Sequence, residues 1–302
     1  MTVGVLVMAH GTPSSPAGIE PFYTRIRRGR PPDAAQLAEL GTRYRAIGGV
    51  SPLAERTAAQ VDALRRALEA RAPGRFTVAF GAKHAEPLIE EAAESLAAAG
   101  PESVIGLVLT PHGSSMGSQE YLDRAAAALE PLGARLVPVA PWYAATALVD
   151  LLAARVREAC AGVSGRAMVL FTAHSLPARV GEAGDTYSDQ VAESARLVAA
   201  AAGADRWGVA WQSAGRTPEP WLGPDVRDEV RRLAAAGGID AVVVCPVGFV
   251  ADHLEVLYDL DVELAAVAAE VGVAYVRTRS LNDDPAFVAL LADVVLAADG
   301  TG

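Results

Sequence analysis

Short runs of β-branched and aliphatic residues alternate with longer segments rich in Ala, Leu, Arg and Glu along the whole chain. Two of the runs, Val-Ile-Gly-Leu-Val-Leu at 104–109 and Ala-Val-Val-Val at 241–244, are apolar at consecutive positions, as strands buried on both faces are. The longer segments have the pattern of amphipathic helices. Strands that alternate with helices form parallel sheets covered by helices, so we expect an α/β protein. The expected strands lie near residues 3–10, 76–82, 103–110, 134–140, 166–173, 207–212, 241–248 and 273–277.

A short motif recurs at the ends of two of these strands. Met-Ala-His-Gly-Thr-Pro at 8–13 and Thr-Ala-His-Ser-Leu-Pro at 172–177 both read Ala-His-x-x-Pro, and His112 follows a third strand. Ligands bind at the carboxyl ends of strands in open α/β sheets. The motif therefore predicts two similar lobes, residues 1–143 and 144–280, whose histidine-bearing edges face a shared crevice. Chance recurrence of so short a motif is the alternative. We expect residues 281–302 to form a C-terminal helix that packs back on the first lobe.

The composition excludes several classes of function. The 302 residues carry a net charge of −10, which argues against a nucleic-acid partner and requires a local basic patch for any anionic substrate. No stretch reaches the roughly 18 apolar residues of a membrane span and no signal peptide is evident, so we expect a cytoplasmic protein.

Cys160 and Cys245 are far apart and favour neither a disulfide framework nor a zinc site. Glycine-rich dinucleotide and nucleotide signatures are missing. With no obvious exposed apolar stripe, we expect a monomer.

Carboxylates recur in the segment that follows the seventh strand. Glu255, Asp259 and Glu263 stand at i, i+4 and i+8 of the expected α-helix and form one stripe. Like charges at this spacing destabilise a helix by ~0.2–0.5 kcal/mol per pair, which a purely structural helix has no reason to accept. The alternatives are a solvated acidic face and, at its start, a capping box of Asp252 with Glu255. His174 is either a hydrogen-bonded core residue or a proton acceptor and metal ligand. Together these residues indicate proton and metal chemistry at a cleft.

Several longer motifs are recognisable as a set. They are Tyr-Thr-Arg-Ile-Arg-Arg-Gly-Arg at 23–30, Arg-Tyr-Arg-Ala-Ile-Gly-Gly-Val-Ser-Pro-Leu-Ala at 43–54, Ala-His-Ser-Leu-Pro at 173–177, Trp-Gln-Ser at 211–213, Pro-Trp-Leu-Gly-Pro-Asp-Val at 220–226 and Phe-Val-Ala-Asp-His-Leu-Glu-Val-Leu-Tyr-Asp at 249–259. From the first strand to about residue 287 the chain strongly resembles ferrochelatase, above all the compact soluble bacterial form that acts on coproporphyrin III. The resemblance implies a pair of Rossmann-like lobes, a porphyrin cleft between them, and insertion of Fe2+ into a porphyrin in haem biosynthesis.

The resemblance also implies roles for single residues. His174 and Glu255 match the catalytic pair of the family, and Asp259 and Glu263 match the acidic residues that continue from it, so these four are the expected metal ligands or proton acceptors. Where many close relatives have tyrosine, on the porphyrin face opposite the catalytic histidine, this chain has His10. We expect His10 to be a ligand of the product iron rather than a structural residue.

Porphyrin carboxylates need cationic or hydroxyl partners, and such side chains are concentrated in one short region of this acidic protein. For any single arginine, solvation of a helix face is the alternative role. The expected porphyrin contacts in this region are Arg27, Arg28, Arg30, Arg43, Tyr44, Arg45 and Ser51. Position alone suggests that Gln119 and Trp142 also line the cleft, whereas His84 is expected to be only a strand-end residue. Residues 22–32 are basic where membrane-associated relatives are apolar, which favours coproporphyrin, with four propionates, over protoporphyrin IX, with two.

Three other functions remain as alternatives: a protoporphyrin IX ferrochelatase, another class II tetrapyrrole chelatase, and a haem or porphyrin carrier without turnover. The acidic series would be superfluous in a carrier. Some actinobacterial relatives bind an iron-sulfur cluster near the C-terminus, but this chain ends Ala-Ala-Asp-Gly-Thr-Gly, so we expect no cluster and no other cofactor. Besides the porphyrin and Fe2+, the expected partners are neighbouring haem-pathway enzymes in transient contact.

Overall fold

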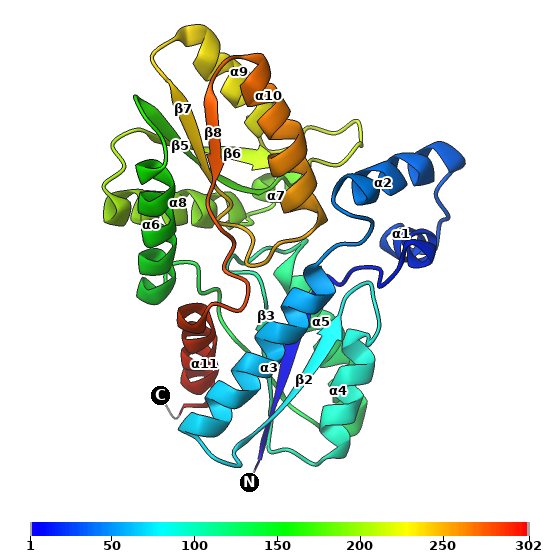
Figure 1. The fold of residues 1–302 in the computed structure, drawn as a ribbon. Coiled ribbons are helices and arrows are strands. Elements are labelled where there is room, and N and C mark those ends of the chain that lie inside the picture. Colours follow the sequence, from blue (N-terminus) through cyan, green and yellow to red (C-terminus); the bar gives the residue numbers. More distant parts are fainter. Residues whose placement is uncertain (1, 301–302) are drawn as a thin grey trace.

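Two parallel four-stranded sheets form the centre of the computed structural model, which describes residues 2–300 (Figure 1). The first sheet has the order β2-β1-β3-β4 and consists of β1 (Val3–Ala9), β2 (Phe76–Ala82), β3 (Val104–Val108) and β4 (Leu136–Pro138). The second has the order β6-β5-β7-β8 and consists of β5 (Ala167–His174), β6 (Trp207–Gln212), β7 (Ala241–Cys245) and β8 (Ala274–Arg277). The expected strands and the α/β class are confirmed, with ends that shift by a few residues.

The two sheets repeat one topology. β5 occupies the place in its sheet that β1 occupies in the other, and each first strand lies between the second and third strands of its lobe. The Ala-His motif therefore ends equivalent strands, which supports the duplicated arrangement over chance recurrence. In each sheet the strand order reverses beside this first strand, which is where α/β proteins form a ligand crevice.

Helices cover both faces of each sheet, and their ends follow local sequence. Asp33 and Gln36 form a capping box before α2, and Gly203 ends α8 in the left-handed conformation. Helix α3 begins at Leu53, with Pro52 as its N-cap. The α-helices are α1 (Ile19–Ile26), α2 (Ala34–Ala46), α3 (Leu53–Arg71), α4 (Ile89–Ala98), α5 (Ser118–Leu129), α6 (Thr146–Ala161), α7 (Arg179–Glu182), α8 (Tyr187–Ala202), α9 (Val226–Ala236), α10 (Ala265–Glu270) and α11 (Pro285–Asp299). Two short 3-10 helices, η1 (Pro16–Gly18) and η2 (Glu130–Leu132), and one π-helix, η3 (Val256–Leu264), complete the chain.

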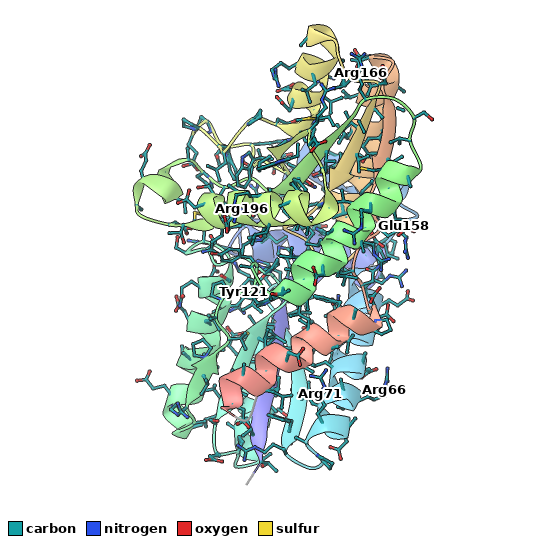
Figure 2. All side chains as sticks on the ribbon, turned by 90° about the vertical axis from the view of Figure 1, so that its left-hand side faces the viewer. Arg66, Arg71, Tyr121, Glu158, Arg166 and Arg196 are labelled. Atoms are coloured by element: carbon teal, nitrogen blue, oxygen red, sulfur yellow. The ribbon has the colours of Figure 1, made fainter. Side chains whose placement is uncertain are left out.

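The largest hydrophobic core runs through both lobes. It contains Leu64 of α3, Phe171 of β5 and Phe287 of α11, all fully buried. The last helix, α11, packs against α3 and β3 of the first lobe and against α6 of the second. It lies beside the labelled Arg71 in Figure 2, and that arginine forms an ion pair with Asp293 of α11. The lobes are thus joined by shared apolar surface and not only by the connecting chain; residues 301 and 302 of the expected C-terminal segment lie outside the described residues.

Two negative expectations concern the described residues. Cys160 and Cys245 are both free thiols, and Cys245 is fully buried. Within residues 2–300, no helix combines the length and apolar character that crossing a bilayer requires.

Candidate active site

His174 is the last residue of β5, and its ring orientation is set by its own backbone. Nδ1 donates to the carbonyl of Ser175, and since a carbonyl oxygen only accepts, Nδ1 carries the hydrogen. Nε2 then points toward Glu255, with 3.7 Å between Nε2 and Oε1. The hydroxyl of Tyr187 donates to the carbonyl of His174 at 3.0 Å and ties the strand end to α8. The pair predicted from the sequence is therefore brought together.

Two features bring Glu255 to this position from the end of β7. Gly248 passes so close to β5 that a Cβ there would lie 2.7 Å from the Cβ of Ala173, so only glycine fits. The buried Gln212 joins the two segments: its Nε2 donates to the carbonyl of Glu255 at 3.3 Å, and its Oε1 accepts from the hydroxyl of Thr172 at 2.9 Å. The Trp-Gln-Ser motif thus serves to align Glu255 with His174.

The pair is strongly coupled by charge. The two side chains retain 35% and 34% of their exposure although protein surrounds them, as expected for residues that line an open cleft. Burial would lower the pKa of His174, but the Glu255 carboxylate outweighs it and raises that pKa. Burial would likewise raise the pKa of Glu255, but the adjacent imidazoles of His174 and His253 hold it well below its usual value. Each charged form therefore stabilises the other.

His253 is a site residue that sequence reasoning missed. Its Nδ1 donates to the carbonyl of Ala251 at 2.9 Å, and its Nε2 lies 3.7 Å from Oε2 of Glu255. The carboxylate of Glu255 thus lies between two imidazoles, one on each oxygen. The available signal was the Asp-His-Leu-Glu motif, which places His253 only two residues from Glu255.

The acidic series continues along η3, which is a π-helix where an α-helix was expected. A π-helix has i→i+5 hydrogen bonds and occurs frequently at functional sites. The expected capping box at its start is wrong, because the Asp252 carboxylate accepts from the hydroxyl of Ser280 at 2.7 Å and from the amide of Asn282 at 2.9 Å. The Asp252 side chain that would have capped the helix is therefore bound by loop residues that follow β8.

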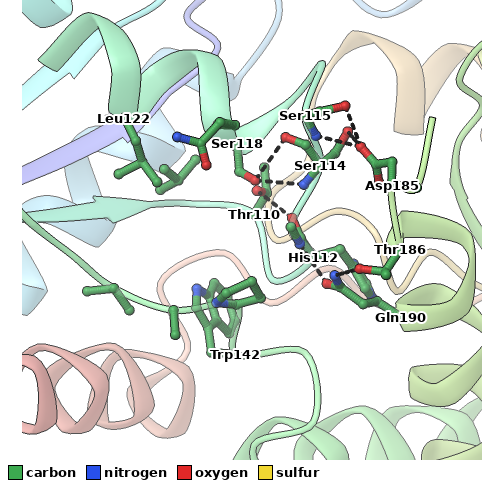
Figure 3. A pocket seen from close by; sticks show the side chains of 17 residues that line it. Thr110, His112, Ser114, Ser115, Ser118, Leu122, Trp142, Asp185, Thr186 and Gln190 are labelled. Carbon is green, nitrogen blue, oxygen red and sulfur yellow. Dashed lines mark hydrogen bonds between the residues drawn. The ribbon is translucent and has the colours of Figure 1, made fainter. Parts of the chain in front are cut away.

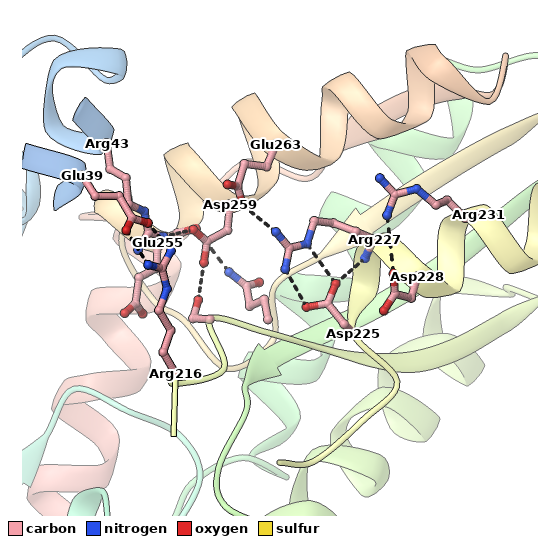
Figure 4. A network of polar contacts seen from close by, with 12 residues as sticks. Glu39, Arg43, Arg216, Asp225, Arg227, Asp228, Arg231, Glu255, Asp259 and Glu263 are labelled. Atoms are coloured by element: carbon pink, nitrogen blue, oxygen red, sulfur yellow. Dashed lines mark hydrogen bonds and ion pairs between the residues drawn. The ribbon is translucent and has the colours of Figure 1, made fainter. Parts of the chain in front are cut away.

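Each later carboxylate of the series already has an arginine partner (Figure 4). Asp259 accepts from Arg43, and Glu263 accepts from Arg227 at 2.9 Å. Burial raises the pKa of Asp259, although Arg43 opposes the shift. Among residues 2–300, no compact group of three or more His, Cys, Asp or Glu side chains could hold a metal ion. The four predicted metal ligands therefore do not form one chelating cluster.

His10 belongs to the opposite lobe and is solvent-exposed. Its Nδ1 donates to the carbonyl of Gly11 at 3.1 Å, which leaves the Nε2 lone pair free. The β1–β2 pairing continues past both strands, where the amide of His84 donates to the carbonyl of His10 at 3.0 Å. This pairing brings the two rings to 4.8 Å, with Phe22 edge-on to both, so His84 has a ring neighbour in the site that the sequence did not predict. His10 keeps contact with solvent, but the neighbouring groups desolvate its ring enough to lower the pKa of His10, against the opposing charge of Glu255.

The other predicted porphyrin contacts fall into two groups. Arg43, Tyr44 and Ser51 are covered at least in part: Tyr44 is buried, and Ser51 accepts from the amide of Leu53 at 3.3 Å. Arg30 and Arg45 are exposed and Arg27 is half-buried; Arg45 donates to the hydroxyl of Thr42 at 2.7 Å, and Arg27 and Arg30 donate to one another's carbonyls. Arg28 is exposed with a φ of 55°.

Gln119 and Trp142 line a separate cavity of about 310 Å³ together with His112 (Figure 3). His112 is a buried core histidine whose Nε2 lies 2.9 Å from the hydroxyl of Ser194, and burial lowers its pKa to about 3. The edge of Tyr187 contacts its ring at 6.0 Å between centroids, and the same tyrosine binds the carbonyl of His174. Of the three strand-end histidines, His112 is therefore the structural one.

Known proteins resemble this chain over nearly its whole length. The Ferrochelatase family model matches residues 2–299. The chain is 44% identical to the Coproporphyrin III ferrochelatase of Geobacillus thermodenitrificans (98% of this chain, 95% of the relative). It is also 44% identical to the Coproporphyrin III ferrochelatase of Bacillus subtilis (97% of each chain).

Solved structures resemble the fold at much lower identity. SirB from Bacillus subtilis with Fe3+ matches with a TM-score of 0.63 and 12% identity, covering 99% of this chain and 96% of that one. CbiX, the terminal enzyme for biosynthesis of sirohaem in denitrifying bacteria, matches with a TM-score of 0.57 and 16% identity, covering 99% of each chain. These likenesses concern the two-lobed fold alone. The family model and the curated relatives both span nearly the whole chain, and the protein therefore belongs to the ferrochelatase family.

Proposed function

We propose that this protein inserts Fe2+ into coproporphyrin III and releases Fe-coproporphyrin. The observation that carries the proposal is the 44% identity, over nearly the full length, to proteins named Coproporphyrin III ferrochelatase. The basic segment around Arg28 supports the same substrate, since four propionates offer more partners to exposed arginines than two.

Metallation replaces two pyrrole N–H protons with the cation, so the site must accept protons on one side of the macrocycle. His174 cannot accept a proton while both of its nitrogens carry hydrogen, which is the form that the charge of Glu255 favours. Its proton must first leave toward Glu255, whose second oxygen faces His253. His174 then acts as general base for the pyrrole protons, and Glu255 passes them outward. Asp259 and Glu263 extend this route for protons or hydrated cations along η3.

His10 is exposed on the other lobe, and its Nε2 lone pair is free to ligate a divalent metal, as a neutral imidazole can. In the proposed complex it is the axial ligand of the product iron. No protein group holds iron tightly before insertion, since a strong chelate would retain the ion that must be passed on.

Turnover with defined porphyrins tests the function. The protein is incubated anaerobically with Fe2+ and either coproporphyrin III or protoporphyrin IX, and the absorption spectrum is followed over many turnovers. We expect repeated turnover with coproporphyrin III and slower turnover with protoporphyrin IX. A stoichiometric spectral change that then stops would identify a carrier, and full activity of His174→Ala would refute the assigned base.

The contribution of the basic segment is tested by one matched pair of variants. Arg28→Gln should raise KM for coproporphyrin III, while Arg66→Gln, at an exposed position of α3, should leave KM unchanged. Equal KM values in both variants would show that Arg28 only solvates the surface.

The remaining expectations belong to the same proposal. The protein acts in the cytoplasm as a monomer without an iron-sulfur cluster, and it meets neighbouring haem-pathway enzymes only transiently. Light scattering and iron analysis of the purified protein test the oligomeric state and the cluster.

A further inference from the structure

Helix α2 is bound to the opposite lobe by two ion pairs on one face. Glu39 and Arg43 stand one helical turn apart, at i and i+4. Glu39 pairs with Arg216, in the loop after β6, and Arg43 pairs with Asp259 of η3 (Figure 4). Both pairs connect the N-terminal lobe to the C-terminal lobe beside the acidic series.

Both carboxylate oxygens of Asp259 are already engaged in this arrangement. One carboxylate oxygen accepts from Arg43 and the other from the hydroxyl of Ser213, and the side chain is only 8% exposed. Hard hydrated cations bind through carboxylate oxygens. While Arg43 and Ser213 occupy both oxygens, Asp259 is closed to such a cation, whereas the neighbouring Glu255 faces only imidazoles.

Arg43 itself is incompletely satisfied. Its guanidinium lies over the ring of Tyr258 at 4.8 Å and makes a single hydrogen bond to Asp259, while its Nε is buried without a partner. Guanidinium groups bind carboxylates most strongly through two parallel hydrogen bonds. A second carboxylate that approaches Arg43 can therefore accept two hydrogen bonds where Asp259 accepts one, and one of the two can satisfy the buried Nε.

The chain around α2 allows such an exchange without disturbing the core. Tyr44 is the only buried residue of α2. The helix is followed by Gly48 and Gly49, both at a φ of 101° and both with open space where a Cβ would stand. Glycine adopts this region without strain, so the connection to α3 is a natural hinge. The lobes, in contrast, share a continuous core and are less free to separate.

We propose that Arg43 exchanges Asp259 for a carboxylate of the incoming tetrapyrrole, so that porphyrin binding opens Asp259 to the cation. The inference rests on the proposed function, because it takes a propionate as the competing carboxylate. It makes Arg43 a positioning residue that sets the order of binding, with the porphyrin first and the cation at Asp259 second. Premature capture of cations by an empty cleft is thereby avoided.

Mn2+ binding, measured from the electron paramagnetic resonance signal of the free ion, tests the exchange. Coproporphyrin III should raise the Mn2+ affinity of the unaltered protein about tenfold, the equivalent of one charge-assisted hydrogen bond released, and its tetramethyl ester should not. Absorption spectra recorded in parallel show whether any Mn2+ enters the macrocycle. Arg43→Gln should bind Mn2+ about tenfold more tightly without porphyrin and should lose the response to it.

Three variants serve as controls. Arg216→Gln breaks the other ion pair of α2 and should leave Mn2+ affinity as it is in the unaltered protein. Arg43→Lys keeps a positive charge beside Asp259, so Asp259 should remain closed to Mn2+ in this variant. Adding Asp259→Asn to Arg43→Gln should abolish the gain.

The outcomes separate this inference from the proposed function. Unchanged Mn2+ affinity in a folded Arg43→Gln variant overturns the exchange, even if coproporphyrin III is metallated at full rate. A tenfold response to coproporphyrin III without any iron insertion would support the exchange and refute the proposed function. An equal response to the tetramethyl ester would show that carboxylates are not the trigger.

Discussion

Replacing Glu255 with glutamine should reverse the direction of the pKa shift of His174. In the present structure the carboxylate raises this pKa against the effect of burial. At the 3.7 Å that separates Nε2 from Oε1, two unit charges attract by about 1 kcal/mol in water and by about 4 kcal/mol at an effective dielectric constant near 20. Because both side chains retain about a third of their exposure, solvent screening moves the value toward the lower limit.

The proton affinity of His174 should therefore fall by about tenfold in Glu255→Gln. Burial remains after the charge is removed, so the pKa should move from above its ordinary value to below it. The raised pKa also makes stability depend on pH. In the unaltered protein the ion pair stabilises the fold at pH values below the unfolded-state pKa of histidine. This stabilisation is lost as pH rises through the raised pKa of His174 in the folded state. The variant should lack that dependence.

The assay is an NMR titration of the imidazole nitrogens, which the presence of only five histidines makes tractable. Glu263→Gln is the matched control, because it removes another carboxylate of the series whose partner is Arg227. It should leave the pKa of His174 nearly unchanged. A pKa of His174 that stays the same or rises in Glu255→Gln would refute the coupled-pair reasoning.

Three further predictions concern the product ligand, the core and acid stability. His10→Tyr should change the electron paramagnetic resonance spectrum of the complex with Fe-coproporphyrin, and an identical spectrum would show that His10 is not an iron ligand. Phe287→Ala should lower the free energy of unfolding in urea by about 3–5 kcal/mol, because this side chain is fully buried. Val262→Ala, at an exposed position, should change that free energy by less than about 0.5 kcal/mol. Similar losses in both variants would contradict a core that depends on α11. Burial lowers the pKa of His112 from 6.5 to about 3, so its contribution to stability is present above pH 6.5 and is lost as pH falls. Between pH 7 and 5 the free energy of unfolding should fall by about 2 kcal/mol on account of this group. His112→Gln should flatten the slope of stability against pH, and an unchanged slope would show that this histidine is not buried in solution.

Much of the architecture could be predicted because it depends on local patterns. Continuous apolar runs such as 241–244 identify strands buried on both faces, and the repeated Ala-His-x-x-Pro predicts equivalent strand ends. The pairing of His174 with Glu255 followed from the family motifs and from their position at the carboxyl ends of strands. The strands and their ends depend on neighbours in the chain, whereas the pairing of two distant residues came from the family resemblance.

Other features could not be predicted because they depend on contacts between distant segments. Asp252 looked like a helix cap, yet Ser280 and Asn282 take its carboxylate. The spacing of the acidic residues gave no sign that η3 is a π-helix, nor that Arg43 pairs with Asp259 from the other lobe.

The sequence by itself determined two α/β lobes, the strand-end histidines and an acidic series directed at one of them, because periodicity and motif spacing record short-range geometry. Tertiary structure alone decided which of those carboxylates are open. Glu255 lies between two imidazoles, whereas Asp259 and Glu263 are each held by an arginine far away in the chain. The physical reason is that the charge state and the availability of a carboxylate depend on the groups within a few ångströms of it, and folding, not sequence proximity, selects those groups.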